Sequence, residues 1–80
     1  MNTETFTAKI RELLASAKGD TLTLNAGDIH RDIGGYPGYN HRMPQCCKVM
    51  YAEMREGDRV VSAPPKGLGA SLTIEYRLPR

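Results

Sequence analysis

The sequence has no apolar run long enough to span a membrane, and its N-terminus lacks a signal-peptide pattern. It also has no internal repeat and no low-complexity tract. These absences argue against a membrane-spanning protein, a secreted protein and a repeat array. By default we expect a cytoplasmic location and no membrane partner.

Cysteine is scarce, because the chain has only Cys46 and Cys47. A disulfide between neighbours on a helix is strained, so both are expected to be reduced. Paired zinc ligands usually stand two to four residues apart, so we expect no metal. A metal site, if present, would draw on Cys46, Cys47, His30 and His41. An outward thiol with a lowered pKa is another alternative, beside Arg42 or Lys48.

The 80 residues make one domain, covering residues 1–80, and 40% of them are hydrophobic. This is an ordinary globular balance, but it leaves little room for a deep catalytic cleft. A core this small often takes part of its stability from a partner or a dimer. A homodimer or a protein partner is therefore among the expectations.

Motifs for catalysis are missing, including a nucleophile elbow and a phosphate-binding loop. The glycines of residues 34–39 stand between two predicted helices rather than between a strand and a helix. His30 or His41 could act as a base with Asp28 or Asp32, but two aspartates four residues apart are more typical of a solvated helix face. We expect no enzymatic activity, no cofactor and no small-molecule substrate.

The net charge is +2, which is too small to indicate a nucleic-acid partner by itself. The distribution is more informative. Residues 1–39 hold four basic and five acidic residues, whereas residues 40–80 hold seven basic and four acidic ones. The excess of +3 in the second half favours an anionic partner on that side.

Residues 3–18 have the periodicity of a helix with one buried face, and Gly19 is a natural stop. The apolar positions are Phe6, Ile10, Leu13, Leu14 and Ala17. Residues 21–24 alternate as a short strand, and Asn25 is a typical helix cap. A helix of about two turns should follow and end at Gly34-Gly35.

Residues 41–55 predict a third helix with an apolar stripe and a polar opposite face. The stripe consists of Met43, Cys46 or Cys47, Met50 and Met54, and the polar face of Arg42, Gln45, Lys48, Tyr51 and Arg55. Pro44 leaves open whether residues 40–42 belong to the helix or to the turn before it. Residues 59–63 and 70–78 then predict two strands joined by a six-residue loop, which is a β-hairpin.

The order helix, short strand, helix, turn, helix, hairpin resembles the winged helix-turn-helix family of DNA-binding domains. The resemblance implies an α+β fold with three helices, a short strand after the first, and a C-terminal hairpin wing. It also implies binding of double-stranded DNA, either sequence-specific or general, with a role in transcription regulation. In such domains the third helix, here His41 to Arg55, enters the major groove, and the wing, residues 58–78, lies against the backbone or minor groove.

The resemblance also implies which side chains touch DNA. Those nearest the base edges would be Asn40, His41, Arg42 and Gln45. Those touching phosphates would be Lys48, Arg55 and Lys66, with Arg59 or Arg77 on the hairpin. The alternative is a protein-interaction module of the same fold, because the methionines and tyrosines near the third helix suit an adaptable apolar surface.

Overall fold

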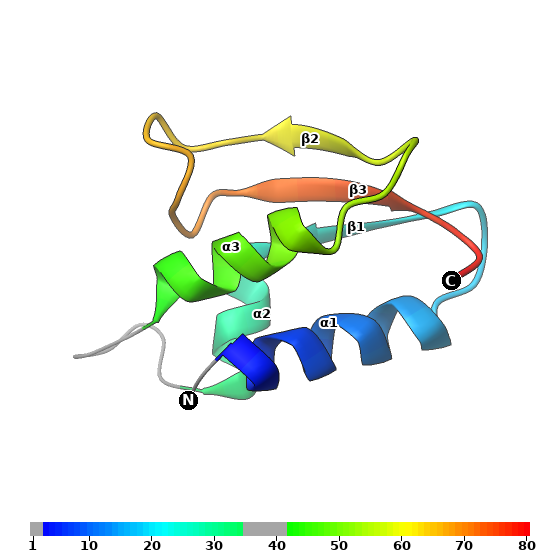
Figure 1. The fold of residues 1–80 in the computed structure, drawn as a ribbon, viewed down its shortest axis with the longest axis horizontal. Helices are drawn as coiled ribbons and strands as arrows, with labels where there is room; N and C mark the ends of the chain where they lie inside the picture. Colours follow the sequence, from blue (N-terminus) through cyan, green and yellow to red (C-terminus); the bar gives the residue numbers. More distant parts are fainter. Residues whose placement is uncertain (1–2, 35–41) are drawn as a thin grey trace.

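The computed structural model describes residues 3–34 and 42–80. These residues form an α+β domain in which helices cover one face of an antiparallel sheet (Figure 1). The elements are α1 (Thr3–Ser16), β1 (Thr21–Asn25), α2 (Ala26–Ile33), α3 (Met43–Ala52), β2 (Arg59–Ser62) and β3 (Thr73–Arg77). None of the described helices is long and apolar enough to cross a bilayer.

The first helix follows its hydrophobic pattern. Phe6, Ile10 and Leu14 are buried on one face of α1, at the spacing that brings successive side chains to the same side. The helix ends two residues earlier than predicted, and Gly19 turns the chain with φ of 98°. Glycine adopts this conformation without the steric penalty that a Cβ would impose. The predicted helix is confirmed.

Asn25 links β1 to α2 and to the sheet. Its side-chain oxygen accepts a hydrogen bond from the Asp28 backbone N–H at 3.1 Å, as an N-cap should. Its amide nitrogen donates to the Thr73 hydroxyl at 3.2 Å. The helix ends at Ile33 with Gly34 as its C-cap. The predicted strand, cap and short helix are therefore all confirmed.

The sheet has the order β1-β3-β2, so β3 lies in the centre. β2 and β3 pair antiparallel, which confirms the predicted hairpin, but the strands are shorter than predicted and residues 63–72 connect them. β1 pairs with the other edge of β3, aligning Leu24 with Ile74 and Leu22 with Tyr76. The alternation of the sequence did not reveal this second pairing, because it identifies a strand's faces and not its neighbours.

The core lies between the sheet and the helices. Phe6 and Ile10 from α1, Met50 from α3, and Ile74 and Tyr76 from β3 are all fully buried. The Tyr76 hydroxyl donates to the Met50 carbonyl at 2.7 Å, so the buried phenol has a partner. Burial raises the pKa of Tyr76 well above its usual value, and the hydroxyl stays protonated.

The third helix is shorter than the sequence predicts. It ends at Ala52, so Arg55 lies beyond it, and the expected extension to Arg55 is wrong. The reason is a tight turn in which the Asp58 carboxylate accepts from the Arg55 N–H at 2.7 Å and Gly57 has φ of 93°. At the other end Arg42 is the N-cap, and proline falls within the first turn of the helix.

Candidate functional site

The N-terminal half of α3 presents a polar face to solvent. Arg42 and Lys48 are exposed and Gln45 is half-buried. On the opposite side Met43, Cys46, Cys47 and Met50 are buried, as the apolar stripe predicted. The burial of this stripe against the core fixes which side chains of α3 face outward.

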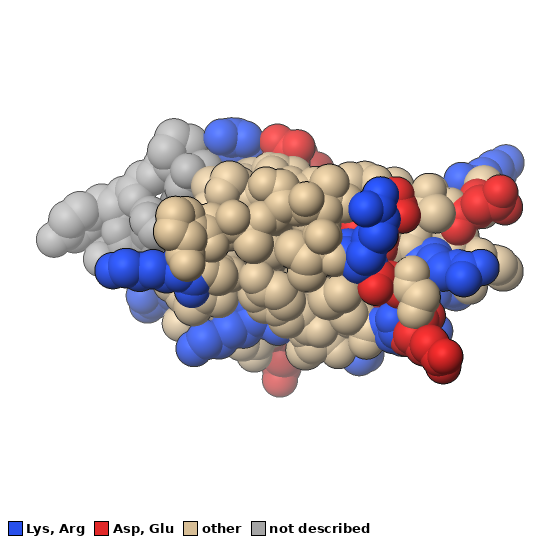
Figure 2. All heavy atoms as spheres, turned by 90° about the horizontal axis from the view of Figure 1, so that it is seen from above, with Lys and Arg blue, Asp and Glu red and all other residues tan. Residues whose placement is uncertain are grey.

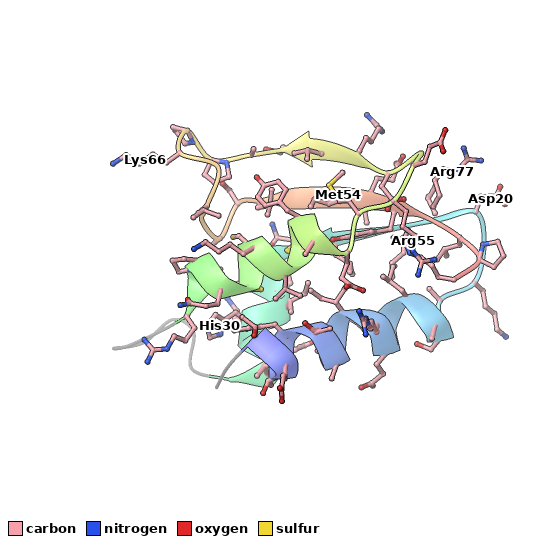
Figure 3. The ribbon with its side chains drawn as sticks, in the orientation of Figure 1. Asp20, His30, Met54, Arg55, Lys66 and Arg77 are labelled. Atoms are coloured by element: carbon pink, nitrogen blue, oxygen red, sulfur yellow. The ribbon has the colours of Figure 1, made fainter. Side chains whose placement is uncertain are left out.

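The loop between β2 and β3 folds against α3. The Tyr51 hydroxyl donates to the Gly67 carbonyl at 2.7 Å, and the Gly69 N–H donates to the Cys47 sulfur at 3.2 Å. Gly67 has φ of 80°, a conformation that favours glycine at a sharp turn. The neighbouring Lys66 is exposed and projects from the end of the molecule where α3 begins (Figure 3).

His30 positions the start of α3. Its ring is fully buried and lies edge-on to Phe6, with centroids 5.1 Å apart. Nε2 accepts from the Arg42 backbone N–H at 3.0 Å, while Nδ1 lies 3.1 Å from the Gly34 carbonyl. A carbonyl only accepts, so the proton resides on Nδ1. His30 thus ties the end of α2 to the start of α3.

This position of His30 makes the general-base hypothesis wrong for that residue, because both ring nitrogens are engaged and the ring is shielded from solvent. Sequence reasoning missed the structural role. The available signal was the place of His30 beside Ile29 on the buried face of a short helix. The second candidate base, His41, lies outside the described residues.

Ion pairs neutralise much of the remaining basic charge. Within residues 3–34 and 42–80 the pairs are Arg11–Glu53, Arg31–Asp28, Arg59–Glu75 and Arg80–Asp58. None of them involves Arg42, Lys48 or Lys66. Figure 2 shows acidic and basic side chains crowded together at the right end of the molecule, opposite the end that holds Lys66 in Figure 3.

The structure brings together only part of the predicted DNA-contacting set. Arg55 and Arg77 lie at the end of the molecule opposite Lys66 (Figure 3), so they cannot join it in one local surface. Arg59 lies on β2, and its Nε atom pairs with Glu75 Oε1 at 3.1 Å. Arg55, Arg59 and Arg77 therefore stay predicted contacts that lie apart from the start of α3. The predicted residues Asn40 and His41 lie outside the described residues.

The two cysteines are part of the core. Both are fully buried, and burial raises the pKa of the Cys46 thiol to about 12 and that of Cys47 in the same direction. The alternative of an outward thiol with a lowered pKa is therefore wrong. Among the described residues, no three His, Cys, Asp or Glu side chains lie close enough to hold a metal ion.

Comparison of the chain with models of protein families, with curated proteins and with solved structures found no match. Three of the predicted DNA-contacting residues lie at or on α3, and a fourth lies on the loop that is hydrogen-bonded to this helix. We call this set, Arg42, Gln45, Lys48 and Lys66, the basic end.

Proposed function

We propose that the domain binds double-stranded DNA through the basic end, with α3 in the major groove and the β2–β3 hairpin as a wing beside it. The observation that carries the proposal is that three exposed cations, at α3 and on the loop hydrogen-bonded to it, have no acidic partner among the described residues. Arg42 is the N-cap of α3, Lys48 lies on α3, and Lys66 lies on the loop of the hairpin. Phosphate binding by such cations dominates the affinity of DNA-binding proteins.

The arrangement of elements supports the interpretation of the domain as a winged helix. The third helix is flanked by a hairpin, and the hairpin is joined to the helix by the Tyr51–Gly67 hydrogen bond. On α3, Pro44 and Ala52 are exposed with Lys48 between them, so the outer stripe of the helix is narrow. The major groove of B-DNA admits an α-helix, so side chains on this exposed stripe can approach base edges.

The side chains of the basic end divide into two roles. Arg42 can bond guanine through two parallel hydrogen bonds, and Gln45 can bond adenine in the same way. Lys48 and Lys66 are compact point charges suited to phosphate contacts. This division predicts a modest base preference on top of a general electrostatic affinity.

Fluorescence anisotropy with a mixed-sequence duplex, repeated at several salt concentrations, tests the proposal. Two phosphate contacts, by Lys48 and Lys66, predict that log K falls against log salt with a slope of about −2. Absence of binding at low salt would end the proposal.

Two substitutions separate the roles. Arg42→Ala should relax the base preference, whereas Lys66→Ala should weaken binding to all sequences alike and reduce the salt slope by about 1. Arg59→Gln is the matched control, because it removes an exposed guanidinium that is already paired with Glu75. Equal losses in all three variants would indicate dependence on total charge and would contradict an interface at the basic end.

One observation favours protein interaction as a second candidate function. The exposed large hydrophobic residues among those described are Val60, Val61 and Leu68, all on β2 or its loop. β2 is an edge strand, and exposed edges can pair with another chain. A second copy of this chain is the partner to test, by sedimentation at increasing protein concentration. Association that persists at high salt, with no DNA binding, would favour this candidate.

A further inference from the structure

A cleft lies between α1 and the chain segments that follow α3 and β3, away from the basic end. Its volume is about 250 Å³. It is lined by Arg11, Leu14, Ala15, Glu53, Arg55 and Arg80. Three arginines and one glutamate around one small cleft make a concentration of guanidinium groups that the proposed DNA interface does not use.

We propose that this cleft binds a small carboxylate with a short hydrocarbon chain, and that Arg55 is its main contact. Figure 3 shows Arg55 in the gap between the sheet and α1. Arg55 is exposed, and it forms no ion pair within the described part of the chain. Its planar fork of donors matches the two oxygens of a carboxylate.

The other two arginines are each matched by a carboxylate of the protein. Arg11 donates to both oxygens of Glu53, at 2.9 and 3.1 Å. Arg80, whose side chain is only 6% exposed, pairs with Asp58 at 2.8 Å. Arg55 also lies close enough to Glu53 to help lower the pKa of that carboxyl, but among the described residues it is the one arginine of the cleft that makes no ion pair with a carboxylate.

The matched arginines still contribute donors. A guanidinium carries five N–H groups, and Arg11 uses Nε and Nη2 on Glu53, which leaves its Nη1 group unused by that pair. The hydrogen bond from Arg11 also keeps the pKa of Glu53 below its usual value, so Glu53 is ionised at neutral pH and stays bound to Arg11. Both carboxylate oxygens of Glu53 thus accept hydrogen bonds from Arg11, so Glu53 is not free to form a second two-bond pair with the guanidinium of Arg55.

The size and lining of the cleft restrict the ligand. About 250 Å³ is below the range of about 300–1,000 Å³ usual for drug-sized ligands, which favours a small ligand. Leu14 is nearly buried and Ala15 is exposed on the α1 side, so part of the lining is apolar. An apolar wall beside an arginine favours a carboxylate with a hydrocarbon part over inorganic phosphate.

Chemical-shift mapping with butyrate tests the proposal, with inorganic phosphate as the comparison anion. We expect saturable shifts of amides in residues 11–15 and 53–55, with a Kd of about 10 mM or tighter for butyrate. Arg55→Gln should weaken butyrate binding at least about tenfold, because the fork and its charge are lost. Arg59→Gln, which removes a guanidinium elsewhere, should leave binding unchanged.

Three results would overturn the proposal. They are the absence of saturable shifts with butyrate, binding by the Arg55→Gln variant equal to that of the wild type, and phosphate binding as tight as butyrate. Because Arg55 is exposed, its substitution should preserve the fold, and circular dichroism verifies this. The inference is independent of DNA binding, since Arg55 lies outside the basic end.

Discussion

The two ends of the long axis handle charge in opposite ways. At the basic end, Arg42, Lys48 and Lys66 are exposed and have no acidic partner among the described residues. At the opposite end the Asp58 carboxylate links three parts of the chain. It accepts hydrogen bonds from the backbone N–H groups of Arg55 and Arg77 and from the Arg80 guanidinium. The three cations of the basic end are free of ion pairs among the described residues, whereas at the opposite end the charges of Asp58 and Arg80 hold the structure together.

This difference shows why the net charge of +2 is a poor guide to function. Asp58, at the end opposite the basic end, pairs with Arg80 close by, so its negative charge does not offset the cations of the basic end.

The ion pairs also differ in how deeply they are buried. Asp58 is fully buried at its side chain, whereas the Arg31–Asp28 pair is exposed on both sides. Only buried pairs of this kind should matter strongly for folding.

The largest effect is expected from Asp58→Ala. It leaves the Arg80 guanidinium buried without its carboxylate and removes the acceptor for two backbone N–H groups. Breaking a buried pair in this way costs about 3–5 kcal/mol, which urea denaturation followed by circular dichroism will measure. Asp28→Ala is the control, with an expected loss below about 1 kcal/mol. Similar losses in both variants would remove the contrast between the two ends.

A smaller effect is expected from acid. Burial opposes ionisation of Asp58, but hydrogen bonds from Arg77, Arg55 and Arg80 outweigh it and hold its pKa below the usual value; Arg11 does the same for Glu53. A carboxylate with a lowered folded-state pKa stabilises the fold above its unfolded pKa of about 4 and loses that contribution as the pH falls through the folded value. Thermal unfolding measured from pH 6 down to about 2 should show this decline. In the Glu53→Gln variant, which lacks the Glu53 carboxyl, the decline of stability with falling pH should be shallower.

Tyr51→Phe tests how the hairpin loop is held at the basic end. Loss of the hydrogen bond to Gly67 should cost about 1 kcal/mol and speed hydrogen exchange at Gly67 and Gly69. If the loop positions Lys66 for DNA, affinity should fall as well. Tyr76→Phe is the matched control, because it removes a hydroxyl bonded to Met50 in the core. Unchanged exchange in the loop of Tyr51→Phe would show that other contacts hold it.

The smallest effect on stability is expected from Lys66→Ala. The side chain is exposed and has no acidic partner among the described residues, so the free energy of unfolding should change by no more than about 0.5 kcal/mol. Denaturation and DNA titration of the same variant then separate folding from binding. A large loss of stability would mean that the basic end is not a free surface.

Local patterns predicted the elements well. The helical spacing of Phe6, Ile10 and Leu14, the cap at Asn25 and the alternation around Ile74 each depend on residues close in sequence. The end of α3 was predicted less well, because the turn at Asp58 competes with the continuation of the helix through side-chain hydrogen bonds. The spacing of apolar residues along the chain gives no sign of such competing hydrogen bonds.

The candidate site was predictable only in part. The polar face of α3 follows from its apolar stripe, so Arg42 and Lys48 could be placed from sequence. The positions of Arg55 and Arg77 could not, because basic residues carry no signal of which end of the molecule they will reach. The support that His30 gives to Arg42 was equally hidden, since it joins two helices through side-chain and backbone atoms.

The sequence alone determined the helices, the hairpin and the side of each that faces the core, because burial imposes a repeat that neighbouring residues reveal. The tertiary structure decided which cations share a surface, which are neutralised, and that β1 completes the sheet beside β3. These outcomes depend on contacts between residues distant in the chain, such as Arg11 with Glu53 and Asp58 with Arg80. No local pattern encodes them, since each charge has several possible partners until the chain is folded.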